Sequence, residues 1–383
     1  MTDQPDATIV ETRLRWYHLT PDRLVVGLLA MEVLLYLSER FRWLPFNEHK
    51  GWTVLIAVAS VGMFLLLMML WCAAAVFFRR RFQFSLRSLL VLVVVVAIPS
   101  SWLATQMRQA ARQKEAVEAI GKAGGVHYDR YNPNDPFGFI GPPFPKWVRN
   151  LVGDDFFRHV KSANVWDDAG LENLHVFAEL DELDLYGTDE ILEHLPGLPR
   201  VETVRLMGDP LRQFTDAGLV HLKKLPHLHS LYLQRASITG AGLVHLKKLP
   251  DLRDLGLYDT DISDAVLGHL AGLHLTTLNL GKTSITDAGL AQLKELAGLS
   301  SLRLRGTAIT DAGLRYLKGL NRLAELDLAD TKITDAGLES LMVLDHLEAL
   351  RLLGTQVTSE GVRKLRKALP NCRIGWRPPH DER

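Results

Sequence analysis

Ile309-Thr310-Asp311-Ala312-Gly313-Leu314 is one copy of a motif that this chain repeats at regular intervals. The motif, or a close variant, begins at Thr215, Thr239, Ser263, Thr286, Thr310, Thr334 and Thr358, in steps of 24, 24, 23, 24, 24 and 24 residues. A fixed period of about two dozen residues indicates one structural unit stacked on copies of itself. The sequence therefore predicts a repeat stack, an architecture that presents a long surface to a partner.

The first half of each repeat has the pattern of a short strand. It reads Leu-x-x-Leu-x-Leu-x-x-Thr, as at Leu299, Leu302, Leu304 and Thr307. Alternating leucines predict a strand with one buried face. Such signatures begin at Leu180, Val201, Leu228, Leu252, Leu275, Leu299, Leu323 and Leu347. We also predict a degenerate copy from Val160 to Leu171, and a final half-copy with Ile374 and Trp376 as its inward residues.

The second half of each repeat has the pattern of a short helix. Leu314, Leu317 and Leu320 are three positions apart, which places them on one stripe. Thr310 is a typical N-cap residue, and Asp311 in the first turn interacts favourably with the helix dipole. We therefore expect a short capped helix after every strand.

The combined pattern resembles the leucine-rich repeat, in the variant whose helical half reads Ile-Thr-Asp-x-Gly-Leu. That variant is known from F-box-associated (GALA-like) and bacterial repeat proteins. The resemblance implies an α/β solenoid with a parallel sheet on the concave side and helices on the convex side. The chain departs from the family where Asn or Cys is common, because Thr occupies that position in consecutive repeats, at Thr260, Thr283, Thr307, Thr331 and Thr355. We expect these hydroxyls to satisfy loop backbone groups of the neighbouring repeat.

The first third of the chain has a different composition. Residues 52–78 and 88–107 contain no charged side chain, and a bilayer crossing needs about 20 apolar residues. These segments predict an all-α transmembrane region at 24–107 with spans at 52–78 and 88–107. The shorter apolar segment 24–38 contains Glu32 and is interpreted as a third span, a re-entrant segment or an interfacial helix.

The charges between the two spans predict their orientation. Arg79, Arg80, Arg81 and Arg87 indicate a cytoplasmic link by the positive-inside rule. The leucine-rich repeats would then be extracytoplasmic, in a multi-pass protein of the cell (inner) membrane. The segment from Phe82 to Leu90 resembles the lead-in to the last span of bacterial membrane-anchored leucine-rich repeat proteins.

These observations predict the following domain organisation. A polar N-terminal segment covers 1–23 and the transmembrane region 24–107. A stalk and N-terminal cap cover 108–159, with a Pro-, Gly- and aromatic-rich segment at 131–147. The leucine-rich repeat domain covers 160–376, and a polar tail covers 377–383.

The composition and motifs favour a protein without catalytic chemistry. The formal net charge is zero, which argues against a nucleic-acid partner. We find no phosphate-binding glycine loop, zinc motif or nucleophile elbow in the sequence. His221, His245 and His269 occupy one position of successive repeats, which indicates a repeated surface residue rather than a metal site. We predict no enzyme activity, cofactor, metal or small-molecule substrate.

The residues between the repeated leucines are the candidate binding residues. Neighbouring strands lie about 4.8 Å apart, so equivalent residues of successive repeats should touch. Arg303, Asp327 and Arg351 should form a charged ladder with Arg305 beside it. Arg and Tyr are enriched at binding hot spots, so the predicted partner-binding residues are Tyr232, Tyr258, Arg303, Arg305, Asp327 and Arg351.

The sequence therefore predicts a membrane-anchored leucine-rich repeat protein, with a lipid bilayer around its anchor, that binds protein partners through its concave sheet. One alternative is a substrate-recognition subunit of a ubiquitin-ligase-like complex, from the F-box-type resemblance. Another is a membrane-embedded enzyme or transporter that uses Glu32.

Overall fold

The computed structural model describes Ala59, Gly62, Leu66 and residues 86–128, 160–208 and 213–378. Contacts divide the chain into two compact units. One is Met1–Ala111 with Phe139–Arg158, and the other is Arg112–Gly138 with His159–Arg383. The repeats all belong to the second unit.

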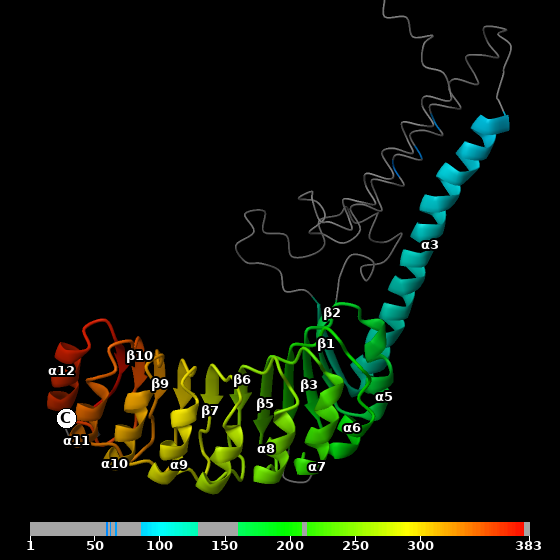
Figure 1. Ribbon diagram of the computed structural model, residues 1–383. Helices are drawn as coiled ribbons and strands as arrows, with labels where there is room; N and C mark the ends of the chain where they lie inside the picture. Colours follow the sequence, from blue (N-terminus) through cyan, green and yellow to red (C-terminus); the bar gives the residue numbers. More distant parts are fainter. Residues whose placement is uncertain are drawn as a thin grey trace, which may run out of the picture. The chain divides into compact units, whose positions relative to one another are not determined.

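From Gly124 onward, the described residues form an 11-stranded sheet whose strand order follows the chain, as Figure 1 shows. The first pair is antiparallel, and every later pair is parallel. The strands are β1 (Gly124–Tyr128), β2 (Val160–Val165), β3 (Glu182–Tyr186), β4 (Thr203–Met207), β5 (Ser230–Gln234), β6 (Asp254–Gly256), β7 (Thr277–Asn279), β8 (Ser301–Arg303), β9 (Glu325–Asp327), β10 (Ala349–Arg351) and β11 (Arg373–Gly375). The expected parallel-sheet repeat fold is confirmed.

A short helical segment follows each strand from β2 to β10 and lies on the outer side of the curved stack (Figure 1). Spacing of three suits a 3-10 helix, which has three residues per turn, and several segments finish in that form. The α-helical segments are α5 (Asp168–Glu172), α6 (Asp189–Glu193), α7 (Asp216–Leu219), α8 (Gly240–Leu246), α9 (Asp287–Gln292), α10 (Asp311–Leu314), α11 (Asp335–Leu341) and α12 (Ser359–Ala368). The 3-10 segments are η4 (Leu174–Val176), η5 (Val220–Lys224), η6 (Asp264–Leu270), η7 (Leu293–Glu295) and η8 (Arg315–Gly319).

The core is a stack of leucines between the sheet and the helices. Leu302, Leu326 and Leu350 occupy equivalent positions of β8, β9 and β10 and are at most 1% exposed. Burying one such side chain contributes about 1.5–3 kcal/mol. Ile374 and Trp376 pack against the end of this core, as predicted. Stability thus comes from many equivalent contacts between neighbouring repeats.

The buried threonine column is satisfied inside each repeat. Thr307 is 5% exposed, and its hydroxyl donates to the Leu304 carbonyl of the same repeat at 2.6 Å. The bond recurs at Thr260, Thr283, Thr331 and Thr355. The prediction that these hydroxyls bond to the neighbouring repeat is therefore wrong. The loop brings each threonine hydroxyl back to the carbonyl three residues before it in the same repeat.

The helix caps join one repeat to the next. Thr310 is an N-cap as predicted, since the Ala312 amide donates to its hydroxyl oxygen at 3.3 Å. The preceding repeat's Asp287 also accepts from the Thr310 amide at 2.8 Å and from its hydroxyl at 2.6 Å. We call this contact the Asp–Thr link. It also joins Asp189 to Thr215, Asp216 to Thr239, Asp264 to Thr286, Asp311 to Thr334 and Asp335 to Thr358.

Among the described repeats between Asp189 and Thr358, one junction lacks the Asp–Thr link. Gly240 occupies the aspartate position, and Ser263, which follows in the next repeat, has no side-chain cap bond. A Cβ at Gly240 would lie 2.8 Å from the Cβ of Val266, and Val266 stands where other repeats have glycine. The small and large residues have exchanged places, so packing replaces the polar contact at this junction.

The N-terminal end of the repeat core is covered by β1 and by the part of α3 (Leu86–Ala123) that follows Ala111. Ala116 and Ile120 of α3 are 1% and 0% exposed and belong to the continuous core. Both residues lie in the same compact unit as the repeats. The segment 131–147, which we expected to form the cap, lies outside the described residues.

The membrane prediction needs correction. Across the described parts of the chain, no helix combines the length and apolar character that a membrane crossing requires. The predicted span 88–107 lies within α3, so it is among the helices that do not meet this requirement. This finding contradicts the predicted span and the multi-pass location in the inner membrane. The predicted spans 24–38 and 52–78 fall outside the described residues, apart from Ala59, Gly62 and Leu66.

Candidate interaction surface

The inner face of the sheet presents two rows of side chains that alternate with the buried leucines. The first row pairs strand by strand and runs Asn164, Asp184, Arg205, Tyr232, Gly256, Asn279, Arg303, Asp327, Arg351 and Gly375. The second row lies two residues further along and runs Trp166, Tyr186, Met207, Gln234, Tyr258, Gly281, Arg305, Ala329 and Leu353. The strand register thus brings the predicted first-row neighbours side by side.

Arg205 organises the N-terminal part of the first row. Its Nη1 lies 3.0 Å from a carboxylate oxygen of Glu182 and 3.0 Å from one of Asp184. Burial lowers the pKa of Arg205, but its hydrogen bonds to Asp184 and Glu182 raise the pKa above the ordinary value overall. The guanidinium carbon is also 5.8 Å from the centre of the Tyr232 ring, within cation–π range. Arg205 therefore holds one side of Tyr232.

A glycine of the next repeat lies beside each of the two predicted tyrosines. A Cβ at Gly256 would lie 2.6 Å from Cδ1 of Tyr232, and one at Gly281 would lie 3.0 Å from Cδ2 of Tyr258. Each ring therefore occupies the space above a glycine of the next repeat. The Lys282 ammonium, on a residue with a left-handed φ of 55°, lies 5.4 Å from the Tyr258 ring centre. Both tyrosines are held in one orientation before any partner arrives.

An aromatic hollow of about 560 Å³ begins the second row. Trp166 is 54% exposed, and its ring meets that of Tyr186 edge to face with centres 5.8 Å apart. Burial and the nearby Asp184 carboxylate raise the pKa of Tyr186. The lining residues are Trp166, Tyr186, Gly187, Met207, Gly208, Gln234, Arg235 and Tyr258. Sequence reasoning missed Trp166, although its place two residues after Asn164 puts it at the head of the second row.

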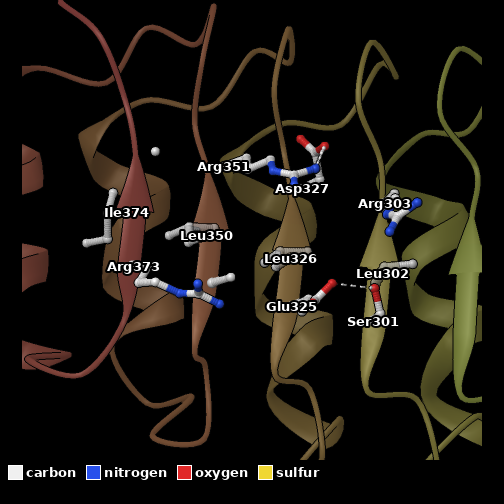
Figure 2. A pocket seen from close by; sticks show the side chains of 12 residues that line it. Ser301, Leu302, Arg303, Glu325, Leu326, Asp327, Leu350, Arg351, Arg373 and Ile374 are labelled. Carbon is white, nitrogen blue, oxygen red and sulfur yellow. Dashed lines mark hydrogen bonds and ion pairs between the residues drawn. The ribbon is translucent and has the colours of Figure 1, made fainter. Parts of the chain in front are cut away.

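The predicted charged ladder is only half formed. Arg351 Nη1 lies 3.4 Å from Asp327 Oδ2, whereas Arg303 has no ion-pair partner among the described residues (Figure 2). The other Asp327 oxygen accepts from the Ala329 amide at 3.0 Å. Arg305 turns instead to Asp330, with its Nε 2.8 Å from that carboxylate. The ladder is incomplete because the two carboxylate oxygens of Asp327 are already engaged by the Ala329 amide and by Arg351.

These charged residues line a second hollow of about 440 Å³ across β8 to β11 (Figure 2). Besides Arg303, Asp327 and Arg351, it contains Ser301, Glu325 and Arg373. Ser301 donates to Glu325 at 3.3 Å. Arg373 was absent from the predicted site because it lies two residues before the first row, in register with Ala349, and the prediction did not include that row.

The described part of the chain contains no group of three or more His, Cys, Asp or Glu side chains that could hold a metal ion. His221, His245 and His269 lie on η5, α8 and η6, on the helical side of the repeats. Glu32, the residue of the transporter alternative, lies outside the described residues.

Comparisons with known proteins found one matching family model and several similar solved structures. The Leucine Rich repeat family model matches residues 273–293 and 323–342. Crystal structures of two Listeria monocytogenes (str. 4b F2365) proteins are similar. Internalin C2 is 26% identical with a TM-score of 0.39, covering 50% of this chain and 80% of that one. An internalin, InlF, is 19% identical with a TM-score of 0.37, covering 54% and 69%. No curated protein matches the chain. Residues 273–293 and 323–342 thus match the leucine-rich repeat, and the described strands from Val160 onward stack into one parallel sheet.

Proposed function

We propose that this chain is a non-enzymatic interaction protein that binds a protein partner on the inner face of its sheet. The observation that carries the proposal is the fixed orientation of Tyr232, whose ring lies between the Arg205 guanidinium and Gly256. A side chain that is already ordered loses little conformational entropy when a partner binds. Tyrosine, tryptophan and arginine are also the residue types enriched at binding hot spots.

The proposed contact residues are the predicted Tyr232, Tyr258, Arg303, Arg305, Asp327 and Arg351, together with Trp166. Trp166 extends the surface because its half-exposed ring continues the second row beyond β3. Leucine-rich repeat proteins generally mediate protein–protein interaction, and stacked repeats offer an extended curved surface for it.

A crosslinking pull-down with the full chain tests the proposal. The inner-face variant is Tyr232→Ala with Arg351→Ala, and the matched outer-face variant is Tyr316→Ala with Arg366→Ala. We expect the inner-face variant to lose the partners that the wild-type chain captures, and the outer-face variant to retain them. Equal recovery of the same partners by both variants would contradict the proposal.

A positioning variant sharpens the same test. Gly256→Ala adds a single methyl group beneath the Tyr232 ring and removes no contacting side chain. If orientation matters, Gly256→Ala should lower partner recovery. If instead it recovers partners as well as wild type while Tyr232→Ala does not, the tyrosine binds without being pre-oriented.

A further inference from the structure

The hollow across β8 to β11 has an uneven charge balance. Three guanidiniums, from Arg303, Arg351 and Arg373, face the two carboxylates of Glu325 and Asp327. One positive charge is therefore in excess in a concave part of the surface.

Both carboxylates in the hollow are already engaged by groups of the protein itself. Asp327 accepts from the Ala329 amide at 3.0 Å and pairs with Arg351 at 3.4 Å. Glu325 accepts from the Ser301 hydroxyl at 3.3 Å. Asp327 is only 9% exposed, so its bonds are satisfied from within the sheet. The acidic residues of the hollow thus belong to its framework.

The two outer arginines have no such engagement. Arg303 and Arg373 are exposed, and neither has an ion-pair partner in the part of the chain that the structure describes. Figure 2 shows Arg303 on β8 apart from the Arg351–Asp327 pair, while the Arg373 side chain extends from β11 over β10. A guanidinium offers five N–H donors in a planar fork that matches a carboxylate. Both forks remain available to a ligand.

We infer that this hollow binds acidic side chains of a protein partner, with carboxylates on Arg303 and Arg373. The inference rests on the proposed function and names the chemistry of one part of its surface. Carboxylates fit these positions because the two oxygens of a carboxylate match the planar fork of a guanidinium. The Arg351–Asp327 pair separates the two binding positions and keeps the excess charge at one unit.

Fluorescence anisotropy with the full chain tests this inference directly. The probe is a fluorescein-labelled hexaglutamate peptide, with hexaglutamine as the uncharged control. Arg303→Gln with Arg373→Gln should weaken hexaglutamate binding about tenfold, since each of the two lost solvent-exposed charge pairs is worth roughly threefold in Kd. The control variant is Arg315→Gln with Arg366→Gln, which removes two exposed arginines from η8 and α12 and should leave the affinity unchanged. Added salt should weaken wild-type binding.

Two results would overturn the inference. One is equal hexaglutamate affinity for the two double variants, which would place the interaction elsewhere or make it non-specific. The other is tighter binding of a phosphoserine peptide than of hexaglutamate by the wild-type chain, which would assign the hollow to phosphate. Neither result bears on the crosslinking comparison of inner and outer faces, so the two proposals fail separately.

Discussion

Replacing Gly313 by alanine tests whether the Asp–Thr link holds the repeats together. Gly313 lies in α10, and a Cβ there would sit 2.9 Å from Cγ of Asp287 and closer still to its Oδ1. That carboxylate is held in place by the Thr310 amide at 2.8 Å and the Thr310 hydroxyl at 2.6 Å. The added methyl group therefore cannot fit unless Asp287 moves away from Thr310.

The expected magnitude follows from opposing effects. Two hydrogen bonds to a charged group contribute about 1.5–3 kcal/mol each, and the half-buried carboxylate places them at the lower end, or about 3 kcal/mol together. Alanine is favoured over glycine inside a helix by about 1 kcal/mol. The difference predicts that Gly313→Ala lowers the free energy of unfolding by about 2 kcal/mol, although the helix itself gains from the substitution.

Urea denaturation followed by circular dichroism measures this change. Gly319→Ala is the matched control in the same repeat, because a Cβ there meets nothing within 4 Å and should be neutral or slightly stabilising. In an Asp287→Ala background the clash with the carboxylate is gone and only Leu290 Cδ1, at 3.1 Å, has to shift slightly, so Gly313→Ala should become neutral or stabilising by up to about 1 kcal/mol. The reasoning is refuted if Gly313→Ala destabilises no more than Gly319→Ala, or equally with and without Asp287.

Three further predictions concern other features of the stack. At the junction without an Asp–Thr link, Gly240→Asp and Val266→Gly should each lower the thermal midpoint of unfolding. The double variant should recover most of that loss, because it restores the aspartate and glycine of the other junctions. An equal loss in the double variant would contradict this prediction. Thr307→Val should cost about 1–2 kcal/mol in urea unfolding by leaving a buried carbonyl without its hydroxyl donor, and Thr307→Ser should not. Burial raises the pKa of the Cys372 thiol, so less thiolate is present at neutral pH. In a Cys72→Ser variant, iodoacetamide should therefore modify the folded chain more slowly than the urea-unfolded chain at pH 7, and equal rates would show that burial does not control the thiol.

Local chemistry made much of the fold readable from the sequence. Thr310 could be recognised as a cap because its amide partner lies two residues away. The second role of the motif aspartates could not be read in the same way, since Asp287 reaches Thr310 across 23 residues and needs the stacking register. One signal was present in the sequence: the repeat that lacks the aspartate, at Gly240, is followed by the repeat that lacks the glycine, at Val266.

The inner face was predictable in its rows but not in its contacts. The repeat period placed Arg303, Asp327 and Arg351 in one row, and the strand register confirms that order. Which arginine pairs with Asp327 depends on side-chain rotamers and on the competing Ala329 amide, which the period does not encode. Trp166 was missed because it belongs to the degenerate first copy, where the leucine pattern is weakest.

The Asp–Thr link gives the stack a direction that matters for how the chain is made. Each aspartate serves the helix of the repeat that follows it, so a finished repeat presents a preformed anionic cap to the next one. Synthesis on the ribosome proceeds from the N-terminus, and folding during synthesis starts there. Asp287 can therefore be in place before Thr310 emerges. Each new repeat then finds, as a template, the aspartate that will accept hydrogen bonds from its N-cap threonine. For this link alone, loss of an N-terminal repeat removes that template, whereas loss of a C-terminal repeat leaves the preceding aspartate to be solvated by water.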